Sequence, residues 1–515
     1  MRVRSKFSLH TMHLPVLPET LNRHLRDGSD LIRSTIVGLA WAPAVSVARS
    51  AILTTLSCID TGTLLLVDEP GGTRHVFGQK LSSGADPSPM GTHERRAGTT
   101  PRVEIVVKKE TFWMRLFLFA DIGFSEAYML GDILCEDLTS FFQLFIINRD
   151  RMRNGTTVVS RISSSLSYLA RSTNTLSNSL LNISAHYDIS NDMFAAFLSS
   201  DMTYSCPVWQ TRIDSGLGDE SLEAAQQRKL TRFIDGAKLK ATDHVLEIGT
   251  GWGSFAIEAV SKTGCRVTSI TLSKEQKELA EARVRAAGLH ERIEVLLTDY
   301  RQLPVPEKPY DKIVSIEMLE AVGQEYLGTY FDCVNRLLKP DGGIAMFQCI
   351  TMPENRHEAY SKSVDFINKY IFPGGYLPST TQLLGHISEQ SHGTLIIEKV
   401  ENIGGHYART LRLWNENFQC HFDSQIKPAL LHNHPGMTKE AVEVFRRKWE
   451  YYFKYCEAGF ATKTLRRCNH YCRARRCYRV TGRDPAIDTR QTRCVQIAID
   501  LQGSKKSLRT FPWSL

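Results

Sequence analysis

Residues 243–254, Asp-His-Val-Leu-Glu-Ile-Gly-Thr-Gly-Trp-Gly-Ser, restrict the fold of this chain more than any other segment. The apolar run at residues 245–248 has the length and composition of a buried parallel strand. Three glycines at alternating positions follow, and they permit both a tight turn and the close approach of a ligand to the backbone. A strand, a glycine-rich turn and a helix in this order are typical of a nucleotide site in an α/β protein.

The acid within this segment narrows the choice of ligand. Glu247 stands near the end of the predicted strand, and the spacing Glu-x-Gly-x-Gly-x-Gly differs from the pattern of dinucleotide sites. A carboxylate there would repel a pyrophosphate, whereas it would tolerate an adenosyl ligand that carries a sulfonium and an amino acid group. An ordinary strand-to-helix turn is the alternative. The acid together with three glycines favours S-adenosylmethionine.

Strand and helix patterns alternate after Ser221, which predicts a doubly wound parallel sheet. The second strand ends at Thr271 and not at the acid that usually holds a ribose, so Thr271 and Gln276 could make these hydrogen bonds instead. The predicted strands cover residues 245–248, 266–271, 293–298, 310–316 and 344–348, and the predicted helices cover residues 223–234, 255–262, 274–287 and 326–338.

The N-terminal part of the chain follows a different pattern. Residues 36–58 are apolar but contain Pro43 and Arg49. A membrane span needs about 20 uninterrupted apolar residues, so this segment predicts an amphipathic or buried helix and no transmembrane span. The next elements are a hairpin at 62–78, a strand at 103–108 and apolar segments at 111–119 and 133–147, the second with helical spacing.

These patterns divide the chain into parts. We predict a flexible N-terminus over residues 1–35, a smaller N-terminal α+β accessory domain over residues 36–150 and a linker over residues 151–184. The doubly wound sheet and a helical lid ahead of it form the main domain, over residues 185–465.

The net charge and the cysteine content bear on the compartment of the protein and on its association with membranes. A formal net charge of +8 over 515 residues fits contact with an anionic membrane surface, although proteins that bind nothing anionic often show the same excess. Twelve cysteines without a framework spacing indicate free thiols in a reducing compartment. We therefore predict a cytoplasmic protein that associates peripherally with membranes, binds no nucleic acid and could form a homodimer.

Several further motifs stand in register between residues 185 and 460. They are HYDISND, MTYSC, VLEIGTGWGS, TLSKEQ, SIEMLEAVG, LLKPDGG, DFINKYIFPGG and HYARTL. With these motifs the chain resembles the cyclopropane-fatty-acyl-phospholipid synthase family, which includes the mycolic acid cyclopropane synthases. Several motifs in register are far more specific than one glycine-rich turn. The resemblance implies a class I S-adenosylmethionine-dependent methyltransferase fold, and residues 41–149 resemble the extra domain of the longer members.

The resemblance also implies a reaction. A methyl group would pass from S-adenosylmethionine to a cis double bond in an unsaturated phospholipid acyl chain at a membrane surface, and a bound bicarbonate would remove a methyl proton as the cyclopropane ring closes. The intermediate cation needs a dry pocket with aromatic faces. The candidates for these faces are Tyr187, Tyr204, Phe366, Tyr370 and Phe372.

Site residues follow from the same resemblance. The bicarbonate ligands would be the backbone of Cys206 and Ile350 with the side chains of Glu320, Gln348 and Tyr407. Ala321 and Gln348 depart from the family, which usually has histidine at both positions. Cys456 matches a C-terminal cysteine that is described as catalytic in the family, although we expect a buried structural thiol there. The cofactor residues would be Tyr204, Ser205, Glu247, Gly249, Gly251, Trp252, Gly253, Thr271, Leu272, Gln276, Tyr300 and Arg301.

Beyond residue 465 the chain departs from the family, which closes the sheet there with an apolar strand. Residues 466–480 are basic and rich in cysteine, with a Cys/His spacing that matches no common zinc pattern, so we predict no metal site. One choice of codons, shifted by one base, encodes the alternating segment GDAIITVGREG instead. We therefore interpret residues 466–515 as a frame-shifted or mis-spliced tail that is poorly ordered and leaves the sheet without its final strand.

Two other functions remain open from the sequence. One is a related sphingolipid or small-molecule methyltransferase, and the other is a lipid-binding relic without catalysis. The intact motifs ahead of residue 465 favour an enzyme.

Overall fold

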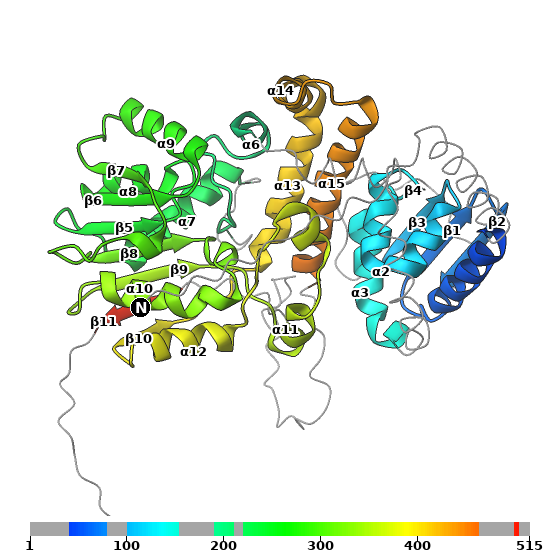
Figure 1. Ribbon diagram of the computed structural model, residues 1–515, viewed down its shortest axis with the longest axis horizontal. Helices are drawn as coiled ribbons and strands as arrows, with labels where there is room; N and C mark the ends of the chain where they lie inside the picture. The colour runs from blue at the N-terminus through cyan, green and yellow to red at the C-terminus, as the bar shows by residue number, and fades with distance from the viewer. Residues whose placement is uncertain (1–40, 80–99, 154–189, 211–219, 463–498, 504–515) are drawn as a thin grey trace, which may run out of the picture.

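The computed structural model describes residues 41–79, 100–153, 190–210 and 220–462, together with the backbone of residues 499–503. A seven-stranded sheet and a four-stranded sheet lie at opposite ends of the molecule (Figure 1). Helices α13 (Gly405–His421) and α15 (Lys439–Ala461) stand between them. The predicted segment 1–35, most of the linker and residues 186–189 of the motif that begins at His186 lie outside the described residues.

The larger sheet confirms the predicted doubly wound α/β fold. Its strand order is β10-β11-β9-β8-β5-β6-β7, and the five strands from β9 to β7 run parallel. Strand β5, the first of these five in the sequence, is buried along almost its whole length because helices cover both faces of the sheet. The bounds are β5 His244–Ile248, β6 Arg266–Thr271, β7 Ile293–Leu297, β8 Lys312–Ile316, β9 Ile344–Gln348, β10 Leu395–Lys399 and β11 Ile499–Gly503.

Two hydrophobic clusters hold helices against the two faces of this sheet. On one face, Phe233 and Phe255 pack with Val245, and on the other, Phe331 and Leu383 pack in a second cluster. Helices α7, α9 and α12 each begin after a serine whose hydroxyl caps the first turn. Ser221 is one example, because its hydroxyl accepts the backbone N–H of the third helical residue at 3.2 Å. The first face carries α7 Leu222–Gly236, α8 Ser254–Thr263 and α9 Lys274–Ala286, and the second carries α10 Leu327–Leu337 and α12 Thr380–Gln390.

The prediction that the sheet lacks its last strand is wrong. Residues 499–503 form β11, which pairs antiparallel with both β9 and β10. The physical reason is a period-2 pattern further along the tail, where Val495, Ile497, Ile499 and Leu501 alternate with polar or small residues. The basic segment that suggested a missing strand, and the Cys/His cluster in it, lie outside the described residues.

The smaller sheet has the order β2-β1-β3-β4 and begins with the predicted hairpin. Alternate residues of β1 are buried, as expected for a strand with one face on a core. The apolar segment at 133–147 is one strand and one helix and not a single helix, because residues 133–134 pair with β3. The bounds are β1 Thr63–Asp68, β2 Thr73–Gly78, β3 Arg102–Val107, β4 Ile133–Leu134, α2 Thr111–Met129 and α3 Leu138–Arg153.

The first described helix covers residues 41–56 and is amphipathic, as predicted. Val45, Ala48, Ile52 and Leu56 are buried on one face at helical spacing. None of the helices in the described part of the chain is long and apolar enough to span a membrane.

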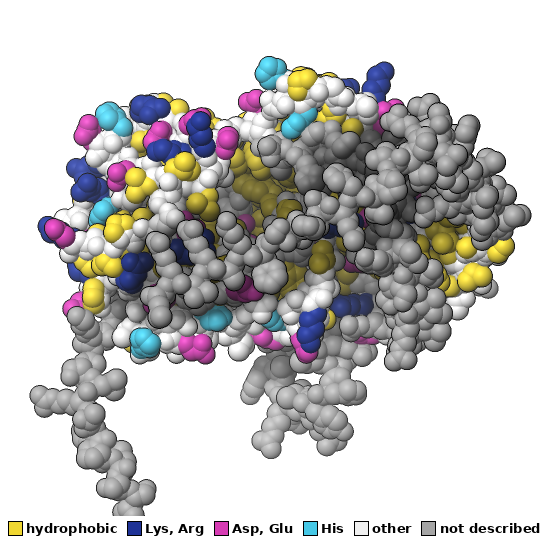
Figure 2. All heavy atoms as spheres, in the orientation of Figure 1, with side chains coloured by type: hydrophobic (Ala, Val, Ile, Leu, Met, Phe, Trp, Pro, Cys, Tyr) yellow, Lys and Arg dark blue, Asp and Glu magenta, His cyan; other side chains and the backbone are white. Residues whose placement is uncertain are grey.

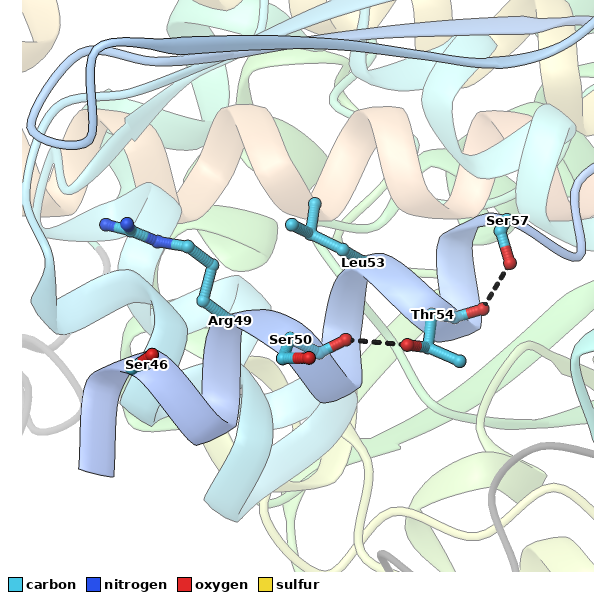
Figure 3. A pocket seen from close by; sticks show the side chains of 6 residues that line it. All are labelled: Ser46, Arg49, Ser50, Leu53, Thr54 and Ser57. Carbon is cyan, nitrogen blue, oxygen red and sulfur yellow. Dashed lines mark hydrogen bonds between the residues drawn. The ribbon is translucent and has the colours of Figure 1, made fainter. Parts of the chain in front are cut away.

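A hollow of about 480 Å³ runs along another face of this helix (Figure 3). Its wall comes from the one helix, and the Thr54 and Ser57 hydroxyls there already donate to backbone oxygens of their own helix at 2.8 and 2.7 Å. The hollow is far in the chain from the glycine-rich turn, and we assign no ligand to it.

Residues 41–153, which carry the smaller sheet and form the accessory unit, share one hydrophobic cluster with residues 190–462, which carry most of the larger sheet. Tyr451 of α15 lies 5.2 Å from Phe142 and 6.4 Å from Phe124, measured between ring centroids. Phe366 packs on the same tyrosine at 4.4 Å. The accessory unit therefore packs directly on the helix that also borders the candidate site. Shorter helices complete the fold, namely α6 Asn191–Phe197, α11 Glu354–Ser361, α14 Lys427–Asn433 and the π-helical turn η4 Ile367–Ile371.

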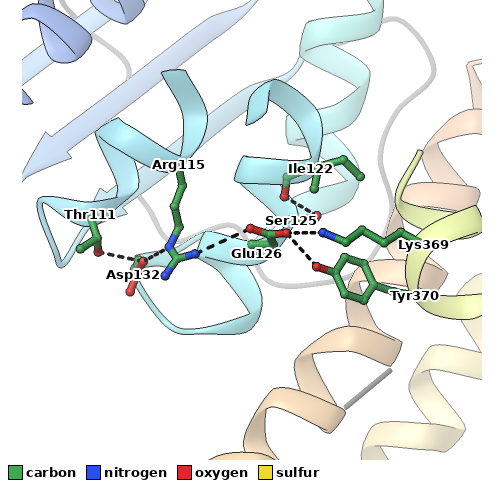
Figure 4. A network of polar contacts seen from close by, with 8 residues as sticks. All are labelled: Thr111, Arg115, Ile122, Ser125, Glu126, Asp132, Lys369 and Tyr370. Carbon is green, nitrogen blue, oxygen red and sulfur yellow. Dashed lines mark hydrogen bonds and ion pairs between the residues drawn. The ribbon is translucent and has the colours of Figure 1, made fainter. Parts of the chain in front are cut away.

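A buried polar network connects the accessory unit to η4 (Figure 4). Glu126 of α2 is 6% exposed, and its Oε1 accepts hydrogen bonds from Lys369 Nζ and Tyr370 Oη, both at 2.7 Å. Arg115 lies between Glu126 and Asp132, with Nη1 3.7 Å from Glu126 Oε2 and Nε 3.1 Å from Asp132 Oδ2. The network fixes the orientation of η4 relative to α2.

Candidate active site

The glycine-rich turn lies at the carboxyl end of β5, and its three glycines adopt left-handed backbone angles. The φ angles are 102° at Gly249, 52° at Gly251 and 86° at Gly253, a region that residues with side chains rarely enter. The N–H groups of Gly249 and Thr250 donate to Ile270 O at 3.0 Å, which ties the turn to β6. A Cβ at Gly251 would meet no atom within 4 Å, so the turn offers room for a ligand close to its backbone.

Glu247 lies inside the sheet under this turn. Its side chain is buried, and Ser269 Oγ lies 2.5 Å from its Oε2 and 2.7 Å from Thr250 Oγ1. Burial raises the pKa of Glu247 to about 8 because a charged carboxylate is poorly solvated there. Glu247 therefore supports the turn through Ser269, and any contact with a cofactor remains a prediction.

Other predicted cofactor residues follow the ends of β6 and β7. Thr271 Oγ1 donates to Gln276 Oε1 at 2.9 Å, and the Leu272 side chain is exposed. Arg301 is paired with Asp299, with Nε 2.9 Å from Oδ1. The carboxyl ends of parallel strands meet at one edge of the sheet, so these groups lie on the same edge as the glycine-rich turn.

Trp252 and Tyr300 from the same prediction are buried. Trp252 Nε1 donates to Asn191 Oδ1 at 2.8 Å, which links the turn to α6. Arg283 Nη1 donates to Trp252 O at 2.7 Å and holds the turn from the other side. The Tyr300 ring packs edge-on against Tyr330 at 5.1 Å between centroids.

Three groups that the family resemblance assigns to bicarbonate converge instead on the carboxylate of Glu317. Cys206 N and Gln348 Nε2 each donate to Glu317 Oε1 at 2.9 Å, and Tyr407 Oη donates to Oε2 at 3.0 Å. Gln348 Nε2 also lies 3.0 Å from Cys206 O. Glu317 directly follows β8, and its φ of 50° is unusual for a residue with a side chain.

The fourth predicted bicarbonate donor contacts a second carboxylate. Ile350 N donates to Glu320 Oε1, while Glu320 Oε2 is buried and has no hydrogen-bond partner among the described residues. Burial, followed by the negative charge of Glu317, raises the pKa of Glu320 to about 8. A bicarbonate ion at these donors would have to displace the Glu317 carboxylate and sit beside two acids. The residues present therefore do not fit a bicarbonate ion.

A buried lysine lies close to this acid pair. Lys229 is 1% exposed, and its Nζ donates to Ser205 Oγ at 2.7 Å. Burial lowers the pKa of Lys229 to about 8, and the nearby charge of Glu317 opposes that change. Ser205, which the resemblance assigns to the cofactor, is thus engaged with a residue of α7.

Aromatic rings surround Tyr204 on several sides. Its hydroxyl lies 2.9 Å from that of Tyr452. Ring centroids lie 5.1 Å away at Trp414 and 6.5 Å away at Phe372. Of the aromatic residues predicted to face the reacting carbon, Tyr204 and Phe372 lie together here. Phe366 and Tyr370 do not, because they pack against α15 and bond to Glu126, and Tyr187 lies outside the described residues.

The two predicted cysteines differ in position. Cys206 is fully buried, and burial raises the pKa of its thiol well above the usual value, which does not suit a thiolate nucleophile. Cys206 contacts the Glu317 carboxylate through its backbone N–H and not through its thiol. Cys456 lies on α15 one helical turn after Tyr452 and is partly buried against the shared core. A catalytic role for Cys456 stays a prediction.

Glu317, Lys229, Tyr452 and Trp414 were missed by the sequence-based prediction. A signal existed for Glu317, since it follows an apolar strand directly and so stands at the carboxyl edge of the sheet. The other three lie on α7, α13 and α15, and their contacts depend on how these helices pack at this edge of the sheet. No local sequence pattern reveals that packing.

A doubly wound sheet with a glycine-rich turn at its carboxyl edge is the fold of a class I methyltransferase, and the family match confirms this class. Residues 174–470 match the family model described as mycolic acid cyclopropane synthetase, which spans more than half of the chain. The chain belongs to this family of S-adenosylmethionine-dependent enzymes that modify lipids.

Individual relatives are similar over long segments. Tuberculostearic acid methyltransferase UfaA1 of Mycobacterium tuberculosis is 40% identical over 354 residues, which cover 67% of this chain and 77% of that protein. Cyclopropane-fatty-acyl-phospholipid synthase of Escherichia coli is 31% identical over 384 residues, covering 72% and 87%. Sphingolipid C9-methyltransferase of Candida albicans is 36% identical over 237 residues, covering 45% of each chain.

Proposed function

We propose that this protein transfers a methyl carbon from S-adenosylmethionine to a cis double bond of an unsaturated phospholipid acyl chain and closes a cyclopropane ring. The observation that carries the proposal is the half-buried carboxylate of Glu317, which three donors hold in place. Gly249 of the predicted cofactor turn lies next to the same segment, since a Cβ there would stand 3.2 Å from Met318 Cβ. A proton acceptor and a cofactor turn side by side are what this reaction needs.

The glycine-rich turn suits the proposed cofactor. Gly251 leaves room at the backbone, and Thr271 and Gln276 at the next strand end offer hydroxyl and amide groups for a ribose. S-adenosylmethionine, when bound, supplies an electrophilic methyl group. The chain itself has to bind and orient this cofactor and keep water away from the reacting carbon.

The aromatic cluster fits the second requirement. Addition of a methyl group to an alkene leaves a positive charge on carbon, and aromatic faces stabilise such a charge without trapping it. Tyr204 and Phe372 offer such faces, and the buried Trp414 packs against the Tyr204 ring. On the face seen in Figure 2, hydrophobic side chains gather in a recessed area between the larger sheet unit and α13, where an apolar chain would be shielded from water.

The same cation allows a second product. Loss of a proton from the former methyl group closes the ring, whereas loss of a proton from a chain carbon, or from the methyl group without closure, leaves a branched chain that keeps a double bond. The 40% identity to a protein named tuberculostearic acid methyltransferase favours this branched alternative. Both products need the same proton acceptor.

The proposed substrate lies in a membrane, so we propose peripheral association with anionic lipid, supported by the net charge of +8. Vesicle co-sedimentation with and without anionic phospholipid measures this association. Equal recovery with both vesicle types would refute an electrostatic contribution.

Lipid analysis of a host that expresses the chain tests the function. Cyclopropanation adds one CH₂ per acyl chain and removes the double bond, whereas a branched product adds one CH₂ and keeps an alkene. Methylation on a sphingoid base or a head group would support the rival methyltransferases. Unchanged lipids, from protein that is folded and supplied with S-adenosylmethionine, would contradict all of these activities.

A further inference from the structure

The carboxylates of Glu317 and Glu320, with the donors around them, indicate a different proton acceptor from the bicarbonate ion that the family resemblance implies. The donors expected to hold an external anion are Cys206 N, Gln348 Nε2, Tyr407 Oη and Ile350 N. All four donate to side chains of this protein, three of them to Glu317 and one to Glu320. The chain has thus placed a carboxylate where the resemblance expects a bicarbonate ion.

We infer that the Glu317 carboxylate is the base that removes the proton from the transferred methyl group, so that the protein works without a bound bicarbonate. This inference rests on the proposed function. A carboxylate matches bicarbonate in charge and in its planar pair of oxygens, so the same donors serve either group. The side chain replaces a diffusible ion with a base that is attached to the end of β8.

The backbone at Glu317 gives independent support. Its φ of 50° lies in the left-handed region, which costs free energy for a residue with a side chain. The following residue, Met318, lies beside the glycine-rich turn, since a Cβ added at Gly249 would stand 3.2 Å from Met318 Cβ. Glu317 N donates to Gln348 O at 2.7 Å. These contacts hold Glu317 and Met318 in a strained conformation that places the Glu317 carboxylate at its donors. Such strain is common where a functional group must be positioned.

Two neighbouring groups determine the charge of this base. Lys229, buried and close by, favours the ionised form of Glu317, as do its three hydrogen-bond donors. Burial and the negative charge of Glu317 raise the pKa of Glu320, so the two carboxyl groups titrate as a coupled pair in which ionisation of one disfavours ionisation of the other. Burial raises the pKa of Glu317 as well, which makes it a stronger base than an exposed carboxylate.

The proton transfer balances without any further reactant. The C–H bond of the transferred methyl group breaks, and its electron pair forms the second C–C bond to the cationic carbon. The proton goes to an oxygen of Glu317, which becomes a neutral carboxylic acid. Release of this proton to solvent restores the carboxylate for the next turnover.

Two variants separate this role from a structural one. Glu317→Gln keeps the shape of the side chain and removes its basicity, so turnover should fall roughly 10²-fold or more. Glu317→Gly removes the side chain at a backbone angle that glycine adopts readily, so it should remain folded. Glu325→Gln, an exposed acid a few residues away, is the matched control and should keep wild-type turnover.

The experiment measures lipid turnover of the purified full chain in buffer depleted of carbon dioxide, with and without added bicarbonate, and follows bicarbonate binding by calorimetry without substrate. The wild type should turn over equally in both buffers and bind no bicarbonate. Glu317→Gly should be inactive in depleted buffer, bind bicarbonate and recover part of its turnover when bicarbonate or formate is added. Calorimetry with S-adenosylmethionine checks that each variant keeps its cofactor site.

Each outcome has one meaning. A wild type that needs bicarbonate, or a Glu317→Gln variant with wild-type turnover, overturns this inference and leaves the proposed function standing. A Glu317→Gly variant that neither binds bicarbonate nor recovers also overturns it, because the donors then do not form an anion site. A wild type that modifies no lipid in either buffer refutes the proposed function itself, and the inference with it.

Discussion

Replacing Glu126 by glutamine should loosen the contact between the accessory unit and the catalytic unit. Glu126 accepts hydrogen bonds from Lys369 and Tyr370 across this boundary, and it is nearly buried (Figure 4). The substitution keeps the shape of the side chain and removes its charge. Hydrogen bonds to a charged group contribute about 1.5–3 kcal/mol, compared with about 0.5–1.5 kcal/mol for neutral pairs. Two such bonds imply a loss of about 2–3 kcal/mol.

Urea unfolding of wild type, Glu126→Gln, Tyr370→Phe and the double variant measures this effect. The two residues share a hydrogen bond, so the double variant should lose less stability than the sum of the single variants, with a coupling of about 1 kcal/mol. Glu136→Gln is the matched control, since this acid lies in the same unit and is exposed. It should change stability by less than about 0.5 kcal/mol.

Turnover should fall together with stability. The segment η4 leads directly to Phe372, whose ring lies 5.9 Å from that of Tyr452 at the candidate site. Strict additivity of the two single substitutions would refute the contact across the boundary. Normal turnover at a temperature where Glu126→Gln remains folded would refute its influence on the site.

Three further predictions concern the cofactor turn, the buried acids and the tail. Gly251→Val should abolish S-adenosylmethionine binding in calorimetry, because a branched side chain would disfavour a φ of 52° and fill the space beside the backbone. Gly342→Val, with a φ of 73° in an exposed turn at the opposite edge of the sheet, is the control that should keep binding. The folded state holds a proton on Glu247 up to about pH 8, whereas an ordinary glutamate loses it near pH 4.5. The stability from this proton is therefore present at pH 4 and lost as the pH rises through 8. The free energy of unfolding should consequently fall less between pH 5 and 8 in Glu247→Gln than in the wild type, and parallel curves would contradict the raised pKa. Leu501→Pro should lower the melting temperature by several degrees, because Leu501 pairs with Ala345 and Ile397 in the middle of the sheet and proline cannot donate to the ladder. An unchanged melting curve, with Leu501→Val as the control, would show that the tail does not occupy that position.

The parallel part of the large sheet could be predicted because its signals are local. Strand β6 begins and ends where its apolar pattern does, and the helix after the glycine-rich turn starts at the predicted position within one residue. The last strand was missed for a different reason. The basic composition directly after residue 465 predicted a tail outside the sheet, whereas the alternating pattern begins only at Val495. A strand so far along the chain from β9 and β10 carries no sequence pattern that shows which strands it pairs with.

The candidate site was only partly predictable. Cys206, Gln348 and Tyr407 were identified from motifs, and the structure brings them together, but around a different group from the one expected. A motif shows which residues stand at matching positions and cannot show where their donors point. Glu317 stands in the same motif as Glu320, and only the turn after β8 reveals that three of the four donors reach Glu317 and one reaches Glu320.

Tyr451 and Tyr452 are consecutive residues of α15 and face different parts of the protein. The Tyr451 ring packs among phenylalanines of the accessory unit, and the Tyr452 hydroxyl lies 2.9 Å from that of Tyr204. Successive residues of a helix are rotated by about 100°, so one helix can serve both sides. A genetic screen for inactive variants should therefore find substitutions in residues 100–153 that never touch the lipid. Such variants would be misread as defects of catalysis unless their folding is measured alongside their activity.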